Sequence, residues 1–326
     1  MRRQVCLDWR KLISQICAIS LVGTRPILYL YYTFVCISIE SMINSLHITP
    51  PIYPIRKVLK MKILAIDTSG QHAGVAIVDD DITIGEILLN ARQGEKSWTH
   101  SEILMPAIDS LFSLVGLKPQ NIDYIAYTAG PGSFTGLRIG ASTALGMARA
   151  LNKPTIPVPT LDALAYNVVG ITHEGYVVPM MDARRGQVYF ALYKPHYHNS
   201  QKNDMYLKRL TDYMALPIKE AVDKIIKEEA MDLWPEEYFF NNILFIGDGA
   251  NAYKDEINKI CIGLSRPLFP HQNLNRQRAA SAGVWAMEQI KTGNYTPTKE
   301  VEILYVRPPQ AIRDAKQAKD TGSKVQ

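Results

Sequence analysis

The chain has 326 residues, of which 47% are hydrophobic and 21% are charged. These proportions are typical of ordered globular domains, so they exclude a disordered chain and a membrane protein with many spans. Because a single hydrophobic core stops growing near about 250–300 residues, the length favours two adjoining lobes.

Positive charge is concentrated at the N-terminus. Residues 1–60 carry eight basic and two acidic side chains, a net charge of +6, so the rest of the chain carries −1 within the total of +5. A nearly neutral body offers little net attraction to a polyphosphate, so direct and dominant nucleic-acid binding is not indicated. Nucleic-acid contact through local basic patches is still an open alternative.

Cysteine is sparse beyond residue 60. Three of the four cysteines, Cys6, Cys17 and Cys36, lie in the first 60 residues, and Cys261 is alone in the body. This spacing gives neither a disulfide framework nor a metal-binding pair. We therefore expect a protein of the reducing cytoplasm.

Residues 1–60 form an extension of a different character from the rest. Two apolar stretches, 13–23 and 27–39, are each shorter than the ~20 residues that a membrane-spanning helix needs. Met61 is followed at once by a strand that would begin a domain, so we expect residues 1–60 to come from a misassigned upstream start. A membrane anchor or a targeting segment is the alternative, and only then would the protein contact a membrane.

The next segments predict one complete lobe over residues 61–168. Three strands rich in Ile, Val and Leu form an antiparallel meander, and an amphipathic helix follows Ser101, which we expect to cap it. The predicted elements in chain order are strands 63–67, 74–78 and 82–89, helix 103–115, strand 123–128, helix 134–151, strand 154–158 and helix 161–168.

Residues 169–326 predict a second, poorer version of the same plan that ends in a disordered polar tail, 313–326. Its predicted elements are strands 176–181 and 187–193, helix 217–229, strand 243–246 and helix 279–290. Two related lobes, each a mixed sheet flanked by helices, indicate an α/β protein of the actin-like, sugar-kinase-like (ASKHA) fold.

A Gly-Pro-Gly turn precedes the helix at 134–151. Ser133 is placed to cap this helix, and the N–H groups at a helix start can hold an anion. Gly130, Gly132 and Ser133 are therefore candidate phosphate-binding residues. A well-made strand-to-helix turn is the simpler interpretation.

A stripe of small residues runs along the same helix. Gly136, Gly140, Ala144 and Ala148 are four residues apart, so they line one face as a smooth groove. Glycine inside a helix costs about 1 kcal/mol, which some close backbone approach must offset. The approaching element is either part of this chain or a helix of a partner.

Two further turns are candidate nucleotide sites. Asp67 ends the first strand before Thr68 and Ser69, where its carboxylate either holds hydrated Mg²⁺ or caps the turn. Gly247 and Gly249 flank an aspartate in a strand-to-helix loop of the second lobe, a weaker signal.

Several stretches together resemble the TsaB family. They are Asp67-Thr68-Ser69, Thr99-His100-Ser101-Glu102, the run AGPGSFTGLRIG at 129–140, the run MDARRGQVY at 181–189, and Tyr305-Val306-Arg307. The resemblance extends in patches over residues 61–308, and GSFTGLRIG is its most specific part.

The resemblance implies a subunit that pairs with a catalytic threonylcarbamoyltransferase of the same fold (TsaD-like). That machinery makes threonylcarbamoyladenosine (t6A) at adenosine 37 of tRNAs that read ANN codons, and it adds an ATPase subunit (TsaE-like) and tRNA as partners. The implied pairing surface lies on the helices of the first lobe. The interface residues predicted on this basis are Ile103, Ala107, Leu111, Gly136, Gly140, Ala144 and Ala148.

The chain departs from the catalytic relative at its metal site. The transferase carries a His-x-x-x-His pair after the fifth strand, whereas this chain has Thr160 and Leu164 at those positions. We therefore expect no catalytic residue, no metal ligand and no cofactor required by this subunit, with room for low-affinity ATP or ADP and Mg²⁺ at the shared interface. The alternative is a self-sufficient ATP-dependent kinase or transferase of small molecules, and a homodimer of the free subunit stays open.

Overall fold

The computed structural model describes residues 61–80, 82–90, 99–171, 175–197, 205–229, 242–294 and 297–307. All of them belong to the unit Lys60–Gln326. The predictions for residues 1–60 and for the tail 313–326 lie outside the described residues. Among the described residues, no helix is both long and apolar enough to cross a bilayer.

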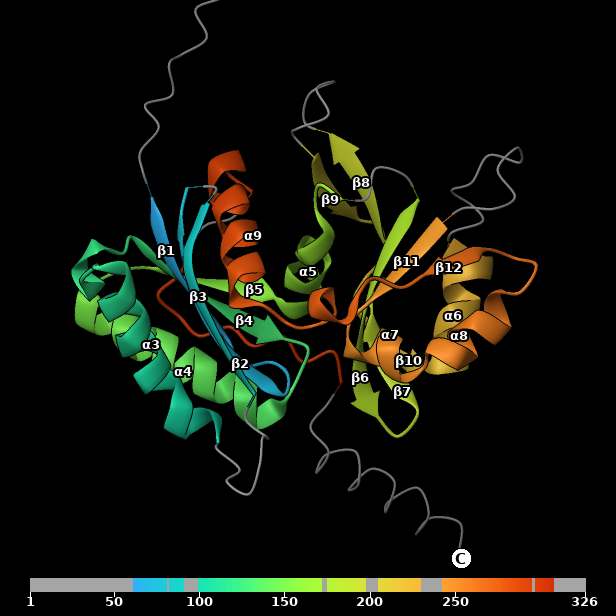
Figure 1. The fold of residues 1–326 in the computed structure, drawn as a ribbon, viewed down its shortest axis with the longest axis horizontal. Helices are drawn as coiled ribbons and strands as arrows, with labels where there is room; N and C mark the ends of the chain where they lie inside the picture. The colour runs from blue at the N-terminus through green and yellow to red at the C-terminus, as the bar shows by residue number, and fades with distance from the viewer. Residues whose placement is uncertain are drawn as a thin grey trace, which may run out of the picture. The chain divides into compact units, whose positions relative to one another are not determined.

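A five-stranded sheet forms the first half of the described chain, in the order β3-β2-β1-β4-β5 (Figure 1). Its strands are β1 (Lys62–Asp67), β2 (His72–Asp79), β3 (Ile82–Asn90), β4 (Tyr124–Gly130) and β5 (Thr155–Pro159). Pairing is antiparallel between β1, β2 and β3, and parallel from β1 through β4 to β5. The predicted meander is confirmed.

Helices cover both faces of this sheet. Helices α3 (His100–Val115) and α4 (Phe134–Leu151) lie on one face and α9 (Ala279–Thr292) lies on the other, as Figure 1 shows. Successive residues of a strand point to opposite faces. Leu64 accordingly joins the core beneath α3 and α4, whereas Ile63 joins the core beneath α9.

The N-cap of the first amphipathic helix lies two residues earlier than predicted. Thr99 is its N-cap, in place of Ser101, because the Glu102 side chain reaches back to accept a hydrogen bond from the Thr99 backbone N–H at 2.7 Å. This is one half of a capping box, which the sequence Thr-x-x-Glu signals.

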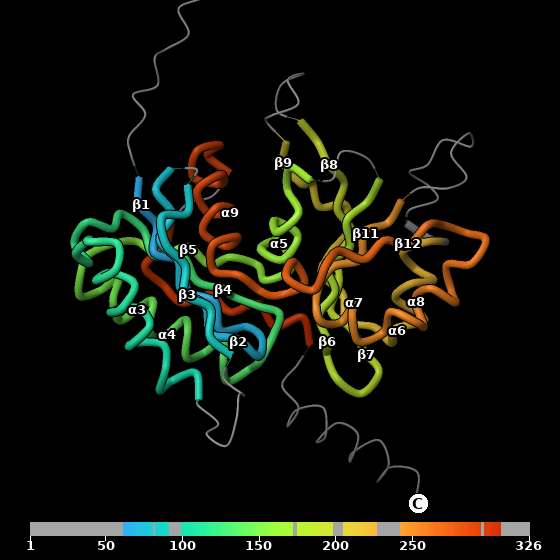
Figure 2. The backbone as a smooth tube through the Cα atoms, in the orientation of Figure 1, coloured from blue at the N-terminus to red at the C-terminus, as the bar shows by residue number. Residues whose placement is uncertain are grey.

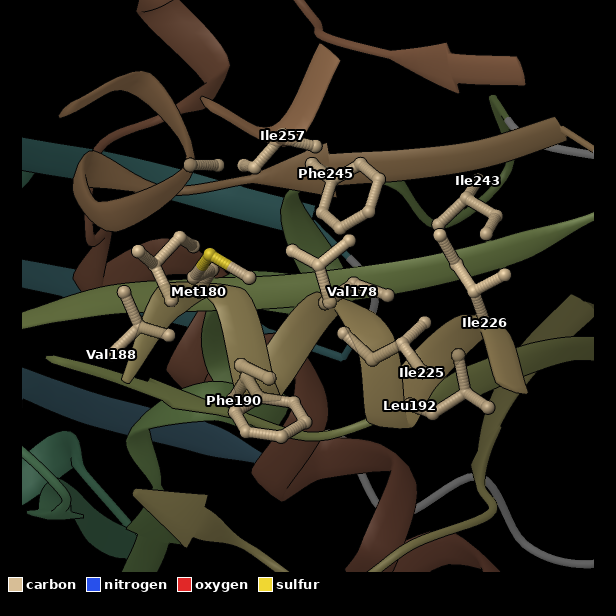
Figure 3. Packing of buried hydrophobic residues seen from close by; sticks show 14 of the residues in the cluster. Val178, Met180, Val188, Phe190, Leu192, Ile225, Ile226, Ile243, Phe245 and Ile257 are labelled. Atoms are coloured by element: carbon tan, nitrogen blue, oxygen red, sulfur yellow. The ribbon is translucent and has the colours of Figure 1, made fainter. Parts of the chain in front are cut away.

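A seven-stranded sheet forms the second half of the described chain. Its order is β10-β7-β6-β11-β12, and β8 pairs with both β6 and β9. The strands are β6 (Tyr176–Arg184), β7 (Gln187–Phe190), β8 (Tyr193–Tyr197), β9 (Met205–Arg209), β10 (Met214–Pro217), β11 (Asn242–Ile246) and β12 (Arg266–Leu268). Helices α6 (Ile218–Asp223) and α8 (Lys254–Cys261) enclose an aliphatic and aromatic core against it, in which Val178, Phe190 and Phe245 are fully buried (Figure 3).

Shorter helices complete the described chain. They are α5 (Thr160–Ala165), α6 (Ile218–Asp223) with a π-helical turn at Lys224–Glu229, α7 (Asp248–Ala252) and α8 (Lys254–Cys261). The sequence did not predict β9, β10, β12 or the separate strand β8. These strands are three to five residues long, and three of them contain or end in proline, so they lack a long periodic pattern.

The C-terminal part of the described chain returns to the first sheet, as the tube in Figure 2 traces. Thr298 forms an antiparallel bridge with Thr155, and the Leu304 N–H donates to the Ala129 carbonyl at 2.7 Å. The predicted division into lobes at residue 168 stays a prediction. Helix α9 and residues 297–307 follow that division in sequence but pack on the sheet that precedes it.

The small-residue stripe of α4 faces the interior of its own chain. Gly136, Gly140, Ala144 and Ala148 are buried, and a Cβ atom added at Gly136 would overlap the Thr68 carbonyl oxygen. The Thr68 hydroxyl donates to the Gly136 carbonyl at 2.8 Å. The turn after β1 fills the groove at Gly136 and Gly140, and Ala144 and Ala148 belong to the core beneath α3 and α4. The prediction that these four residues seat a partner helix is therefore wrong.

The three predicted interface residues on α3 face the same way. Ala107 and Leu111 are at most 5% exposed and belong to the core beneath α3 and α4, and Ile103 is half-buried. The apolar period that marked these positions is the period of the buried face, so the surface left for a partner lies on the opposite sides of the two helices.

We predict opposite effects of alanine at two glycines of α4. Gly136→Ala should lower the free energy of unfolding by about 1–3 kcal/mol, because the added methyl group displaces the Thr68 backbone. Gly146 has no atom within 4 Å of an added Cβ, so Gly146→Ala should raise that free energy by about 0.5–1 kcal/mol through helix propensity. Urea denaturation of both variants tests the packing, and equal effects would contradict it.

Candidate functional site

The end of β1 holds a buried carboxylate. Asp67 is 2% exposed, and its Oδ1 accepts hydrogen bonds from Ser69 N at 2.9 Å, Ser69 Oγ at 2.7 Å and Thr128 Oγ1 at 3.1 Å. Asp67 therefore caps its own turn, which was the simpler of the two predicted roles. Its Oδ2 is buried and has no hydrogen-bond partner among the described residues.

Burial controls the ionisation of this carboxylate. Desolvation raises the pKa of Asp67 above its usual 3.8, and the bonds from Ser69 and Thr128 oppose that shift. Removing a charge from water is costly unless enough donors replace the water. The free Oδ2 is the part of the carboxylate that lacks such donors.

Donors at the start of α4 are used within the chain. The Ser133 N–H donates to the Ser69 carbonyl at 2.7 Å, and the Gly136 N–H donates to Ser133 Oγ at 3.3 Å. Ser133 thus caps the helix as predicted. The amides of Ser133 and Gly136 offer no free donor to a phosphate, so the predicted phosphate site at this turn lacks two of its donors.

In the loop after β11, which contains Gly247 and Gly249, the backbone donors are also used within the chain. Gly247 N–H donates to Asn275 Oδ1 at 3.1 Å, and Gly249 N–H donates to Asp248 Oδ1 at 3.0 Å. Burial raises the pKa of Asp248, and hydrogen bonds from Asp182 and Gly249 oppose the shift. Both glycine amides therefore serve the loop itself.

One side chain that the sequence analysis did not single out, Gln277, joins the turn after β1 to the loop after β11. Gln277 Nε2 lies 3.5 Å from Asp248 Oδ1, and the Gln277 side chain lies against Gly70, where an added Cβ would come within 2.8 Å of Oε1. Gln277 is 4% exposed. The structure thus brings the turn after β1 and the loop after β11 together and fills the space between them with an amide.

The donor set does not fit a bound metal ion. Mg²⁺ takes six oxygen ligands, usually one or two carboxylates with water or phosphate. Asp67 offers one enclosed oxygen, and the described residues contain no group of three His, Cys, Asp or Glu side chains placed to hold a metal. The prediction of low-affinity nucleotide and Mg²⁺ binding stays a prediction.

A second buried carboxylate was missed by sequence reasoning. Asp162 of α5 accepts hydrogen bonds from the hydroxyl groups of Tyr193 and Tyr213, the latter at 2.9 Å. Burial raises the pKa of Asp162, and both tyrosine bonds oppose that shift. The three residues are 31 and 51 positions apart, so no local pattern joins them. Their contacts tie α5 to β8 and to the segment before β10.

The exposed side of α4 and the neighbouring Tyr305 form a candidate interaction surface. We use the name outer face for the exposed residues Phe134, Arg138 and Ser142 of α4 together with Tyr305. The Arg138 guanidinium lies 3.8 Å from the Phe134 ring centroid, and its Nε donates to the Tyr305 hydroxyl at 3.2 Å. A shallow open pocket beside them is lined by Phe134, Thr135, Arg138, Ile139, Ser142 and Thr143.

Comparison with known proteins gives a family match over most of this region. A family model described as TsaD, tRNA N6-adenosine threonylcarbamoyltransferase, matches residues 94–317, more than two thirds of the chain. The protein named tRNA threonylcarbamoyladenosine biosynthesis protein TsaB of Bacillus subtilis is 40% identical over 134 residues, which cover 41% of this chain and 56% of that protein. The protein of the same name from Escherichia coli is 34% identical over 134 residues, covering 41% and 55%.

These matches leave part of each relative unaccounted for, since the chain spans about half the length of the curated relatives it matches. The solved structure of YeaZ from Pseudomonas aeruginosa is similar with a TM-score of 0.56 and 22% identity, over 75% of this chain and 99% of that one. This structural similarity supports the fold alone. The predicted fold class, two related α/β lobes of the actin-like and sugar-kinase-like type, is confirmed.

Asp67→Asn should change how stability depends on pH. Because the pKa of Asp67 is raised on folding, the native state binds more protons than the unfolded state above pH 3.8, and the stability of the wild type falls as pH rises through this window. Asparagine cannot ionise. The free energy of unfolding of the variant minus that of the wild type should therefore increase with pH, by up to about 1.4 kcal/mol per pH unit, until the folded pKa is passed.

Urea denaturation between pH 4 and 8 measures this difference. Asp109 is exposed on α3, so Asp109→Asn is the matched control for removing one carboxylate from the surface. A falling difference for Asp67→Asn would mean that the folded protein stabilises the charged carboxylate, and a flat difference would mean that folding does not shift its pKa; either result contradicts the prediction.

Proposed function

Since the chain belongs to the family described as tRNA N6-adenosine threonylcarbamoyltransferase and, within it, to the TsaB family, we propose that it is the non-catalytic partner subunit of a tRNA-modifying transferase. It pairs with the catalytic paralogue and stabilises it during threonylcarbamoylation of adenosine 37 in tRNAs that read ANN codons. The observation that carries the proposal is the identity of 34–40% to relatives named for threonylcarbamoyladenosine biosynthesis.

Residue chemistry supports a role without catalysis. Thr160 and Leu164 stand where the catalytic relative has its histidine pair, and both are buried, with exposed fractions of 0% and 1%. Leucine has no atom that binds a metal, and an enclosed threonine hydroxyl is a poor substitute for imidazole. The amides of Ser133, Gly136, Gly247 and Gly249 in the predicted phosphate and nucleotide loops also donate within the chain.

The outer face supports pairing with another protein. Phe134 is 39% exposed on α4, and its ring lies against both the Tyr305 ring and the Arg138 guanidinium. Arg138 and Tyr305 add a guanidinium and an aromatic ring, two groups enriched at protein interfaces. The occupant that we propose is the corresponding helical surface of the transferase paralogue.

The remaining partners follow from that pairing. Through the transferase the chain meets an ATPase subunit and tRNA, in the cytoplasm, and the free chain uses the same outer face to form a homodimer. No nucleotide is required by this subunit, and any ATP, ADP or Mg²⁺ is bound at the shared interface.

Reconstitution tests the function. The chain should co-purify with its transferase paralogue, and tRNA modification by the transferase and ATPase subunits should depend on adding it. Modification of tRNA by the isolated chain, or full activity of the transferase without it, would refute the proposal.

A charge at the centre of the outer face should weaken pairing. Ser142 is exposed and lines the pocket on α4, so Ser142→Glu would bury an unpaired carboxylate in the complex and should raise the Kd for the transferase at least tenfold, about 1.4 kcal/mol. Lys259→Glu introduces the same residue on α8, at an exposed site beside the second sheet, and should leave the Kd unchanged. Titration of the purified subunits by calorimetry measures the Kd of both variants. Equal Kd values would mean that the interface does not include α4.

A further inference from the structure

The hairpin between β6 and β7 presents two arginines in an unusual backbone conformation. Arg184 and Arg185 have φ angles of 62° and 56°, and Gly186 follows with 71°. Left-handed backbone suits glycine and asparagine and is uncommon for long side chains. Both arginines are exposed, so packing does not explain why the turn carries them. Neither backbone preference nor packing accounts for arginine at these two positions, so we look to the guanidinium groups themselves.

Hydrogen bonds hold the hairpin in place. Asp182 Oδ1 accepts the Arg184 N–H at 2.8 Å, and Gly186 O accepts the Ile218 N–H at 3.0 Å. Strand β7 lies between β6 and β10, which fixes the base of the hairpin on both sides. The arginines therefore extend from a firm support.

Two further cations belong to this surface. Arg307 Nη1 donates to the Ala183 carbonyl at 3.2 Å, which places its guanidinium against the hairpin, and Lys219 is exposed next to Ile218. The exposed acids close by in the chain are Asp182 and Glu220. Within the described part of the chain, none of the three guanidinium groups forms an ion pair with a carboxylate. We call Arg184, Arg185 and Arg307 the arginine cluster.

We propose that the arginine cluster binds the phosphate backbone of tRNA within the transferase complex, an inference that rests on the proposed function. Guanidinium groups match phosphate oxygens in pairs and are the residue of choice for this contact. The cluster lies on an exposed turn, whereas a small nucleotide needs a concave site that encloses it. An extended polyanion fits this shape better.

The position of the cluster agrees with this assignment. Tyr305 of the outer face is two residues from Arg307, so the cluster borders the surface that we assign to the transferase. A tRNA held mainly by the partner would reach it at the edge of the interface. The net charge of −1 over residues 61–326 also fits a few local phosphate contacts that orient the RNA, rather than binding by the whole surface.

Asparagine at both turn positions separates a functional role from a structural one. Asparagine tolerates left-handed backbone, so the double variant Arg184→Asn, Arg185→Asn should be at least as stable as the wild type in urea. Its complex with the transferase should nonetheless bind fluorescent tRNA at least fivefold more weakly in 0.1 M salt. The slope of log affinity against log salt concentration should become shallower by about 1–2.

The matched control removes two cations elsewhere. Lys259 and Arg266 are exposed near β12, which β11 separates from the hairpin strands, so Lys259→Asn with Arg266→Asn should leave tRNA affinity and salt slope unchanged. The conservative pair Arg184→Lys, Arg185→Lys should keep most of the salt slope. Pairing with the transferase is measured first for each variant, and a wild-type chain that does not pair defeats the proposed function itself.

Three results would overturn the assignment of the arginine cluster to tRNA and leave the proposed function intact. The first is a normal tRNA affinity for an asparagine variant that pairs normally. The second is loss of ATP binding by the complex with tRNA binding intact, which would assign the cluster to a small nucleotide. The third is impaired pairing of the asparagine variant, which would assign it to an acidic surface of the partner.

Discussion

The close approach of α4 to the turn after β1 is the constraint on which the rest of the structure depends. Two glycines, Gly136 and Gly140, leave space that Thr68 occupies, and the Thr68 hydroxyl binds the Gly136 carbonyl at 2.8 Å. The same turn positions Asp67 under Thr128 and supplies the carbonyl that Ser133 binds. Strand, turn and helix are therefore one packed unit, and the outward side of α4 is fixed by what its inward side must contact.

The polar groups of the predicted nucleotide sites are also used in packing, because they already form hydrogen bonds within the chain. In the turn before α4 and the loop after β11, the amides of Ser133, Gly247 and Gly249 donate within the chain. Gln277 fills the space between the loop after β11 and the turn after β1. A buried polar group that is already satisfied gains little from a ligand. Polar groups inside this protein thus connect its two sheets, and interaction is left to the surface.

Two surfaces remain, and they meet along the returning C-terminal segment. Residues 301–307 run from the first sheet to the β6–β7 hairpin, with Tyr305 contacting Phe134 and Arg138 and with Arg307 contacting Ala183. One short segment therefore links the outer face that we assign to a protein partner with the arginine cluster that we assign to RNA. A subunit that orients both needs no reactive group of its own.

The sequence by itself determined the elements with long periodic patterns: the meander of β1 to β3, the full extent of α4 and the Ser133 cap. Those features depend on local propensity and hydrogen bonds between neighbours. It did not determine which way the α4 stripe faces, because a smooth groove seats either a turn of the same chain or a partner, and only the packing of Thr68 decided between them. The contact of Gln277 with Gly70 and the return of α9 to the first sheet likewise join residues far apart in the chain, which no local pattern encodes.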